Sequence, residues 1–188
     1  KNIRHNMKLV IVGTGYVGFI SGLCFAEFGL QTICVDRDAS RINNLKKGKC
    51  PFYEPGLANL LNKHLKETKL LSLSTSLSDT MVGADIVFIT VGTPTKRLEN
   101  EADLTAVYKV ADDIADNINK YCLVVTKSTV PVGTTKEINK ILEKKVNKEK
   151  FNVVSNPEFL REGSAISDFM SPDRVVIGCD SVKAESIM

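Results

Sequence analysis

Hydrophobic and polar positions form two kinds of stretch that alternate along the chain. Short unbroken apolar runs, rich in β-branched residues, are separated by stretches whose apolar residues recur every three or four positions. The first kind is typical of strands buried on both faces of a parallel sheet, and the second of amphipathic helices. The runs expected to be strands are 8–12, 32–35, 70–73, 85–91, 121–126, 152–154 and 174–177. This alternation predicts an α/β fold with a doubly wound, mostly parallel sheet and helices on both faces.

The first expected strand leads into a glycine-rich turn, Gly13-Thr14-Gly15-Tyr16-Val17-Gly18, and then into a helical pattern. In such a turn Gly13 permits the tight bend, Gly15 lets a pyrophosphate approach the backbone, and Gly18 lets helix and strand pack closely. The second strand ends in Asp36, where a carboxylate accepts the adenosine ribose hydroxyl groups. These features predict a Rossmann-like site for NAD. Arg37, next to Asp36, keeps NADP open as an alternative.

Polar or proline-bearing junctions follow several of the expected strands, which end at Val12, Val35, Val91, Thr126 and Val154. Because parallel strands share one carboxyl edge, these junctions are expected to face one crevice. Ser128 and Thr129 follow one strand, and a hydroxyl group there can hold a water molecule or a substrate oxygen. Glu158 and Glu162 follow another; one turn of helix after Pro157 would place both carboxylates on one face, which suits acid–base chemistry.

Two further local patterns give expectations about the second half of the chain. Thr134 and Glu137 have the spacing of a capping box, so a helix is expected to start with Thr134 as its cap. The apolar run 174–177 is expected to be a last strand, followed by the start of another helix.

Composition narrows the class of protein. The 188 residues are 43% hydrophobic and 25% charged with a formal net charge of +3, which is ordinary for a globular protein. Basic residues are spread out, so no nucleic-acid partner is expected, and no apolar run reaches the length of a membrane span. Five cysteines without a CxxC pair and two isolated histidines give no metal-ligand cluster. The odd number of cysteines, with Cys24, Cys34 and Cys122 in apolar helix or strand patterns, points to the reducing cytoplasm.

A series of motifs covers nearly the whole chain: Gly13–Gly18, Pro51–Leu57, Val91–Pro94, Lys127–Thr134, Asn156–Gly163 and Pro172–Val175. Together, and in this order, these motifs resemble the NAD-binding domain of the UDP-glucose/GDP-mannose dehydrogenase family. The resemblance implies an NAD-dependent oxidation of a nucleotide-sugar C6 hydroxyl group to a carboxylate. It also implies that two hydrides leave in turn, with a cysteine thioester between the second transfer and hydrolysis.

The resemblance also implies roles for single residues. The cofactor-binding set is Gly13, Gly15, Tyr16, Val17, Gly18, Asp36, Arg41, Val91, Thr93, Ser128 and Glu162. The catalytic set is Thr129, which holds a water molecule, Glu158, which assists thioester hydrolysis, and Glu162, which lies between nicotinamide and substrate. The substrate-binding set is Glu158, Phe159, Leu160 and Arg161, although Phe159 and Leu160 equally suit a packing role.

The sequence departs from the family pattern in one respect. The family's catalytic cysteine lies in a glycine- and phenylalanine-rich motif that none of the five cysteines matches. We therefore expect residues 1–188 to form a single NAD-binding domain, the N-terminal domain of a larger dehydrogenase whose middle and C-terminal domains are absent here. The whole enzyme is expected to be a homodimer or a larger oligomer.

Details of the motifs at Pro131-Val132-Gly133 and Glu162-Gly163 favour the members that oxidise UDP-glucose. Dehydrogenases of GDP-mannose or UDP-N-acetylmannosamine remain alternatives, as does a non-catalytic NAD-binding module.

Overall fold

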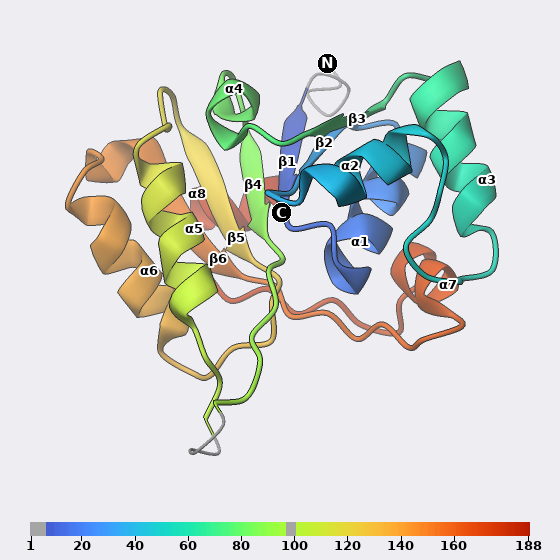
Figure 1. Cartoon of the computed structure of the whole chain (residues 1–188). Helices are drawn as coiled ribbons and strands as arrows, with labels where there is room; N and C mark the ends of the chain where they lie inside the picture. The colour runs from blue at the N-terminus through green and yellow to red at the C-terminus, as the bar shows by residue number, and fades with distance from the viewer. Residues whose placement is uncertain (1–6, 97–100) are drawn as a thin grey trace.

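A computed structural model describes residues 7–96 and 101–188, in which six strands form one parallel sheet (Figure 1). The strands are β1 (Lys8–Val12), β2 (Gln31–Val35), β3 (Leu71–Ser74), β4 (Ile86–Ile89), β5 (Cys122–Thr126) and β6 (Phe151–Ser155). Their order in the sheet is β3-β2-β1-β4-β5-β6, and every neighbouring pair is parallel. The predicted Rossmann-like fold is confirmed.

Helices connect the strands and cover both faces of the sheet. They are α1 (Tyr16–Glu27), α2 (Ala39–Lys46), α3 (Leu57–Asn62) with the π-helical turn η2 (Lys63–Glu67), α4 (Leu77–Met81), α5 (Thr105–Ala115), α6 (Thr134–Glu143), the 3₁₀ turn η3 (Lys148–Lys150), α7 (Ala165–Met170) and α8 (Val182–Ile187). Figure 1 shows α5 and α6 beside the β4–β6 half of the sheet, and α1, α2 and α3 beside the β1–β3 half.

Alternate residues of the central strands enter two different cores. Leu9 and Ile11 of β1 lie in the core with α1, α3 and α7, whereas Val10 and Val12 lie in the core with α4, α5 and α6. This follows from the two-residue period of a strand, and it explains why β4 is apolar and buried throughout. Cys24, Cys34 and Cys122 are buried in these cores.

The order of the strands fixes where a ligand can bind. The chain winds outward from β1 through β2 to β3 and then crosses over to β4 on the other side of β1. A crevice forms at such a reversal, outside the carboxyl ends of the strands. The loops after β1, β2, β4, β5 and β6 all leave from this edge.

The expectations for the start of α6 and for the run 174–177 are wrong. The start of α6 is Gly133 in the left-handed conformation (φ 96°), so Thr134 and Glu137 form no capping box. The Thr134 hydroxyl instead donates to the Pro131 carbonyl, and Glu137 pairs with Lys140.

The second error concerns the run 174–177, which is not a strand of the sheet. This segment meets β6 only at one antiparallel bridge, between Ser155 and Gly178. The side-chain amide of Asn156 donates to the Val176 carbonyl, so a side chain takes the place of a backbone ladder bond. Helix α8 follows, as expected.

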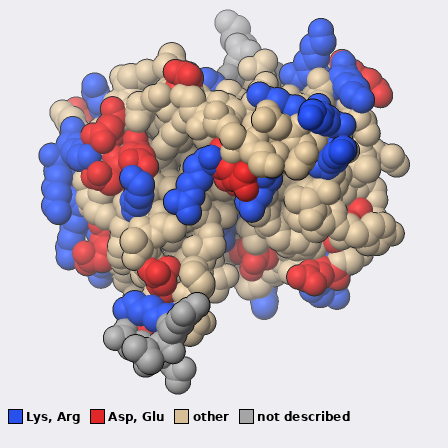
Figure 2. Space-filling model, in the orientation of Figure 1, with Lys and Arg blue, Asp and Glu red and all other residues tan. Residues whose placement is uncertain are grey.

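On the face drawn in Figure 2, basic and acidic side chains are interspersed and do not gather into one basic patch. Of the helices in the described part of the chain, none is long and apolar enough to span a membrane.

Candidate functional site

The turn between β1 and α1 has the backbone that the glycines predict. Gly13 has φ 103°, and its amide donates to the Val35 carbonyl at 2.8 Å. A Cβ atom at Gly18 would overlap the Gly13 carbonyl oxygen and Thr90 Oγ1, whereas a Cβ at Gly15 would meet no atom within 4 Å. Gly18 thus permits close packing, and Gly15 leaves open space above the turn.

Helix α1 begins in this open space. Its N-cap is Gly15, no side chain caps it, and its first turn holds no acidic residue. A helix N-terminus with uncapped N–H groups favours an anion through its dipole and its free donors. The turn and the amides of Tyr16 and Val17 therefore fit a pyrophosphate group.

Asp36 lies at the end of β2, close to this turn. Its Oδ2 accepts from the Thr14 amide and the Thr14 hydroxyl, each at 2.8 Å, and from the Arg41 guanidinium at 3.1 Å. Burial alone would raise the pKa of Asp36, but these bonds and one from the Asp38 amide hold it below its usual value. Asp36 is therefore a fixed anion at the expected position of the adenosine ribose, with Arg41 beside it.

The ends of β4 and β5 are tied together by hydroxyl groups. The Ser128 hydroxyl donates to the Val91 carbonyl at 2.7 Å, and the Thr93 hydroxyl donates to the Thr129 carbonyl at 2.9 Å. The structure therefore brings Val91, Thr93 and Ser128, which the resemblance assigns to the cofactor, together with Thr129, which it assigns to catalysis. Thr129 itself is exposed at the carboxyl edge of the sheet.

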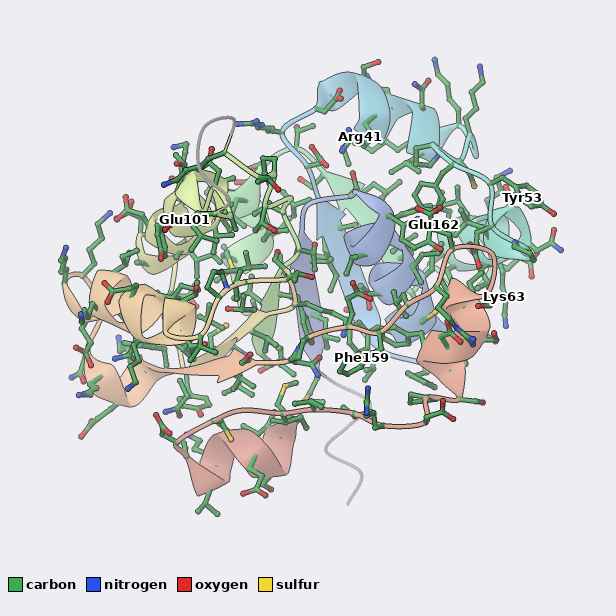
Figure 3. The ribbon with its side chains drawn as sticks, turned by 90° about the horizontal axis from the view of Figure 1, so that it is seen from below. Arg41, Tyr53, Lys63, Glu101, Phe159 and Glu162 are labelled. Atoms are coloured by element: carbon green, nitrogen blue, oxygen red, sulfur yellow. The ribbon has the colours of Figure 1, made fainter. Side chains whose placement is uncertain are left out.

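Residues 156–164, between β6 and α7, are extended or turned and not helical, which corrects the expectation of a helical turn after Pro157. The Asn156 amide donates to the Thr126 carbonyl instead of starting a helix, and Glu158 accepts from the Leu160 amide at 2.6 Å. Glu158 and Glu162 therefore do not share a helix face. In Figure 3, Phe159 and Glu162 lie apart along this extended segment.

Each predicted residue of this segment has its own surroundings. Glu162 is exposed and close enough to Tyr16 for its charge to help raise the Tyr16 pKa, which burial and Glu54 bring to about 12. The Arg161 guanidinium pairs with Asp168 at 2.7 Å. Phe159 is 48% exposed beneath the Arg174 guanidinium, and Leu160 packs against the core.

Glu54 is a buried residue to which the sequence analysis gave no role. It is 4% exposed and accepts hydrogen bonds from the Tyr16 hydroxyl (2.9 Å) and from the amides of Gly163 (2.9 Å) and Ala165 (2.7 Å). It thereby ties the loop before α3 to the start of α7 and to the glycine-rich turn. A lone acid in an apolar, proline-bearing loop was the available signal.

Lys127 and Asn156 were also missed as single residues, although both lie in quoted motifs. Lys127 is 6% exposed, and its Nζ donates to Asn156 Oδ1 at 3.1 Å. A lysine directly after a buried strand is the signal that could have indicated a buried charge.

The described residues contain no group of three or more His, Cys, Asp or Glu side chains that could hold a metal ion. His64, isolated in sequence, is buried between Glu27 (2.7 Å) and Thr68 (2.9 Å) and stabilises the contact of η2 with α1.

Comparison with known proteins agrees with this geometry. Residues 7–188 match the sequence model of the NAD binding domain of the UDP-glucose/GDP-mannose dehydrogenase family. The chain belongs to this family. Because the matched domain is the family's NAD binding domain, and because the glycine-rich turn, the start of α1 and Asp36 fit a dinucleotide, NAD is its cofactor.

Individual relatives point the same way. The chain is 48% identical over 174 residues (93% of its length) to the UDP-glucose 6-dehydrogenase of Rhizobium meliloti, and 47% identical over 182 residues (96%) to UDP-glucose 6-dehydrogenase TuaD of Bacillus subtilis. It spans 40% and 39% of the lengths of these two proteins.

Solved structures extend the likeness to three dimensions. A UDP-glucose dehydrogenase from Pyrobaculum islandicum superposes with a TM-score of 0.93 at 38% identity, over 100% of this chain and 44% of that one. A GDP-mannose dehydrogenase from Pseudomonas aeruginosa superposes with a TM-score of 0.88 at 34% identity, over 96% and 43%.

Proposed function

We propose that the chain is the NAD-binding domain of a UDP-glucose 6-dehydrogenase. Such an enzyme oxidises the C6 hydroxyl group of UDP-glucose to a carboxylate in two hydride transfers. The observation that carries the proposal is the 48% identity to a UDP-glucose 6-dehydrogenase over 93% of the chain. The family match, residues 7–188, includes every residue proposed for the site.

The cofactor half of the proposed site is the edge formed by β1, β2 and β4. NAD, when bound, supplies the hydride acceptor. The N–H groups of Tyr16 and Val17 would bind the pyrophosphate, while Asp36, with Arg41 beside it, would accept the adenosine ribose hydroxyl groups. The negative charge of Asp36 would repel a 2′-phosphate, which favours NAD over NADP.

The reacting half lies at the ends of β4 and β5. The bond from Ser128 to Val91 and the bond from Thr93 to Thr129 fix these two loop segments against each other. Val91, Thr93 and Ser128 would thus form one rigid wall along the cofactor. The exposed Thr129 hydroxyl can both donate and accept, so it would hold a water molecule next to the substrate.

The segment between β6 and α7 would supply the carboxylates. Glu158 is half-buried and would act as the base that activates water for thioester hydrolysis. Glu162, beside Tyr16, would lie between cofactor and substrate. The backbone of Phe159, Leu160 and Arg161 would contact the nucleotide sugar.

The proposal has consequences for partners and organisation. We propose that residues 1–188 form one domain, that further domains of the same enzyme supply the thioester cysteine and complete the sugar pocket, and that the whole enzyme is a cytoplasmic homodimer or larger oligomer. No nucleic-acid or membrane partner is needed for this chemistry.

The test uses the full-length gene product that contains this chain. With UDP-glucose and NAD⁺ it should release about two NADH per UDP-glucuronate formed. Glu158→Gln should lower turnover by about 10²–10⁴-fold, because the base is lost while shape and hydrogen bonding are kept. Mass spectrometry should then show an accumulated acyl-enzyme.

Glu149→Gln, on the exposed turn η3, is the matched control and should turn over normally. An unmodified Glu158→Gln protein with normal turnover would show that Glu158 is only a surface carboxylate. Faster oxidation of GDP-mannose or UDP-N-acetylmannosamine than of UDP-glucose would move the enzyme to another branch of the family.

A further inference from the structure

Lys127 is a buried cation that none of the proposed roles uses. By the alternation of β5, its side chain lies on the same face of the sheet as Leu123 and Val125, towards α1 and α7. Its Nζ donates to Asn156 Oδ1 at 3.1 Å and lies 5.4 Å from the ring centroid of Phe169. Within the described residues no carboxylate is close enough to form an ion pair with it.

The Lys127 side chain lines a cavity of about 690 Å³, where it meets few other charges. The floor is apolar and includes Leu9, Phe25 and Phe88. The other charged side chains that line the cavity are Glu158, Asp168 and Arg174.

Asp168 and Arg174 already interact with other side chains, whereas Glu158 accepts only from the Leu160 amide of its own segment among the described contacts. Asp168 is held by Arg161 at 2.7 Å, and Arg174 lies 4.8 Å over the Phe159 ring. Glu158 is therefore the carboxylate whose charge acts on Lys127. Burial lowers the pKa of Lys127 to about 8, and the charge of Glu158 opposes that fall.

Asn156 connects this ammonium group to the segment that carries Glu158. Its amide donates to the Thr126 carbonyl at the end of β5, and its side-chain amide donates to the Val176 carbonyl, each at 2.9 Å. Lys127 itself is bonded through its backbone amide to Ile89 of β4. The ammonium group thus lies where the ends of β4 and β5 meet the segment with Glu158.

A purely structural role does not explain a charge at this position. A buried ammonium group with one neutral acceptor and one aromatic ring destabilises a fold, and methionine would fill the same space without a charge. Lysine differs from methionine in its positive charge and in the N–H donors of its ammonium group. Both act on the segment that carries Glu158, because the ammonium group donates to Asn156.

We propose that Lys127 is a positioning residue of the dehydrogenase site, which holds residues 155–160 against the end of β5 through Asn156 and supplies the positive charge that faces the Glu158 carboxylate. The electrostatic part of this inference rests on the proposed function, because it assigns Lys127 to the base of the hydrolysis step. The positioning part rests on the contacts of the chain itself.

The positioning part is tested on this chain by amide hydrogen exchange. Lys127→Met should speed exchange of the Asn156 and Leu160 amides by about tenfold, because the hydrogen bond that orders them is lost. The amides of Gly163 and Ala165, held by Glu54, should keep their rates and serve as an internal reference. Lys127→Arg, which retains charge and donor, should restore most of the protection.

The electrostatic part is tested on the full-length enzyme through its pH–rate profile. The wild type should lose kcat on the alkaline side near pH 8, as Lys127 loses its proton. Lys127→Arg should move this limb upward by at least one pH unit, because guanidinium stays charged. Lys127→Met should lower kcat at pH 7 by at least tenfold while KM for NAD⁺ stays within about twofold.

Each outcome decides one part of the inference. Unchanged exchange at Asn156 and Leu160 in Lys127→Met would overturn the positioning role. Altered exchange with an unchanged pH–rate profile would overturn the electrostatic role. An enzyme that oxidises no nucleotide sugar would overturn the proposed function, while the exchange result on the chain would still decide the positioning role.

Discussion

At the scale of single residues, we propose that Asp36 determines the choice of cofactor. Its carboxylate is fixed by Thr14 and Arg41, so it meets a ribose without reorganising. The chain should bind NAD⁺ in preference to NADP⁺, and Asp36→Ala should weaken NAD⁺ binding by roughly 1–3 kcal/mol through loss of a charge-assisted hydrogen bond. Isothermal titration calorimetry measures both.

The matched control is Asp113→Ala on α5, where the carboxylate pairs with Lys109 at the surface. This variant should bind NAD⁺ as the wild type does. NADP⁺ binding as tight as NAD⁺ binding in the wild-type chain would contradict the role given to Asp36.

Lys127 should make the stability of the fold depend on pH. Its pKa is about 8 in the folded chain against 10.5 for the free group. Below pH 8 both states are protonated and the folded state carries the full cost of the buried charge. Between pH 8 and 10.5 the folded state has lost its proton and the unfolded state has not, so stability rises with pH by an amount of order 3 kcal/mol.

Urea unfolding of the wild type and of Lys127→Met at several pH values isolates this contribution. The comparison is needed because burial raises the pKa of Cys24, Cys34 and Cys122 to about 12, so these thiols lower stability above pH 9 in both proteins. The wild type should gain on the variant from pH 7.5 to 10. A constant difference across this range would refute the prediction.

At the scale of elements, two glycines in the turn from β1 into α1 have different roles: Gly15 leaves room for the cofactor, and Gly18 lets the helix pack closely on the strand. Gly15 has φ −68° and open space, so Gly15→Ala should leave stability within about 0.5 kcal/mol and still obstruct the pyrophosphate. Gly18→Ala places a methyl group against the Gly13 carbonyl and should destabilise the fold by about 2 kcal/mol or more.

Thermal unfolding and NAD⁺ titration of the two variants provide the measurement, and each variant is the control for the other. A destabilised Gly15→Ala, or a Gly18→Ala as stable as the wild type, would show that the two glycines have other roles than the geometry gives them.

At the scale of the whole molecule, cofactor binding and turnover should be separable. The chain spans about 40% of the length of its curated relatives and has no cysteine in the family's catalytic motif. Three of its five cysteines are buried with raised pKa values, so they supply no thiolate at neutral pH.

The isolated chain should therefore bind NAD⁺ without oxidising UDP-glucose. Absorbance at 340 nm after mixing the purified chain with UDP-glucose and NAD⁺ should stay flat. Steady NADH formation would show that this chain alone completes the site.

The frame of the cofactor site could be predicted from the amino-acid sequence alone. The apolar runs predicted the positions of the six strands, because a strand that is buried on both faces has apolar residues at consecutive positions. The glycine-rich turn and Asp36 were predicted for the same reason. The glycine-rich turn and Asp36 each follow directly after a predicted strand, so both are recognised from residues close together in the sequence. The order of the strands in the sheet then brings the turn and Asp36 next to each other.

The contacts between segments far apart in the chain could not be predicted, because they depend on how the whole domain packs. Pro157 and Glu158 looked like the start of a helix, but the amide of Asn156 found a partner in β5 and the segment stayed extended. The run 174–177 had the composition of a strand, yet the Asn156 side chain took the place of a ladder bond. Glu54 and Lys127 became buried charges because of donors and acceptors supplied by other elements. Local periodicity records which residues are apolar, whereas the partner of a buried polar group is set by the packing of the whole domain.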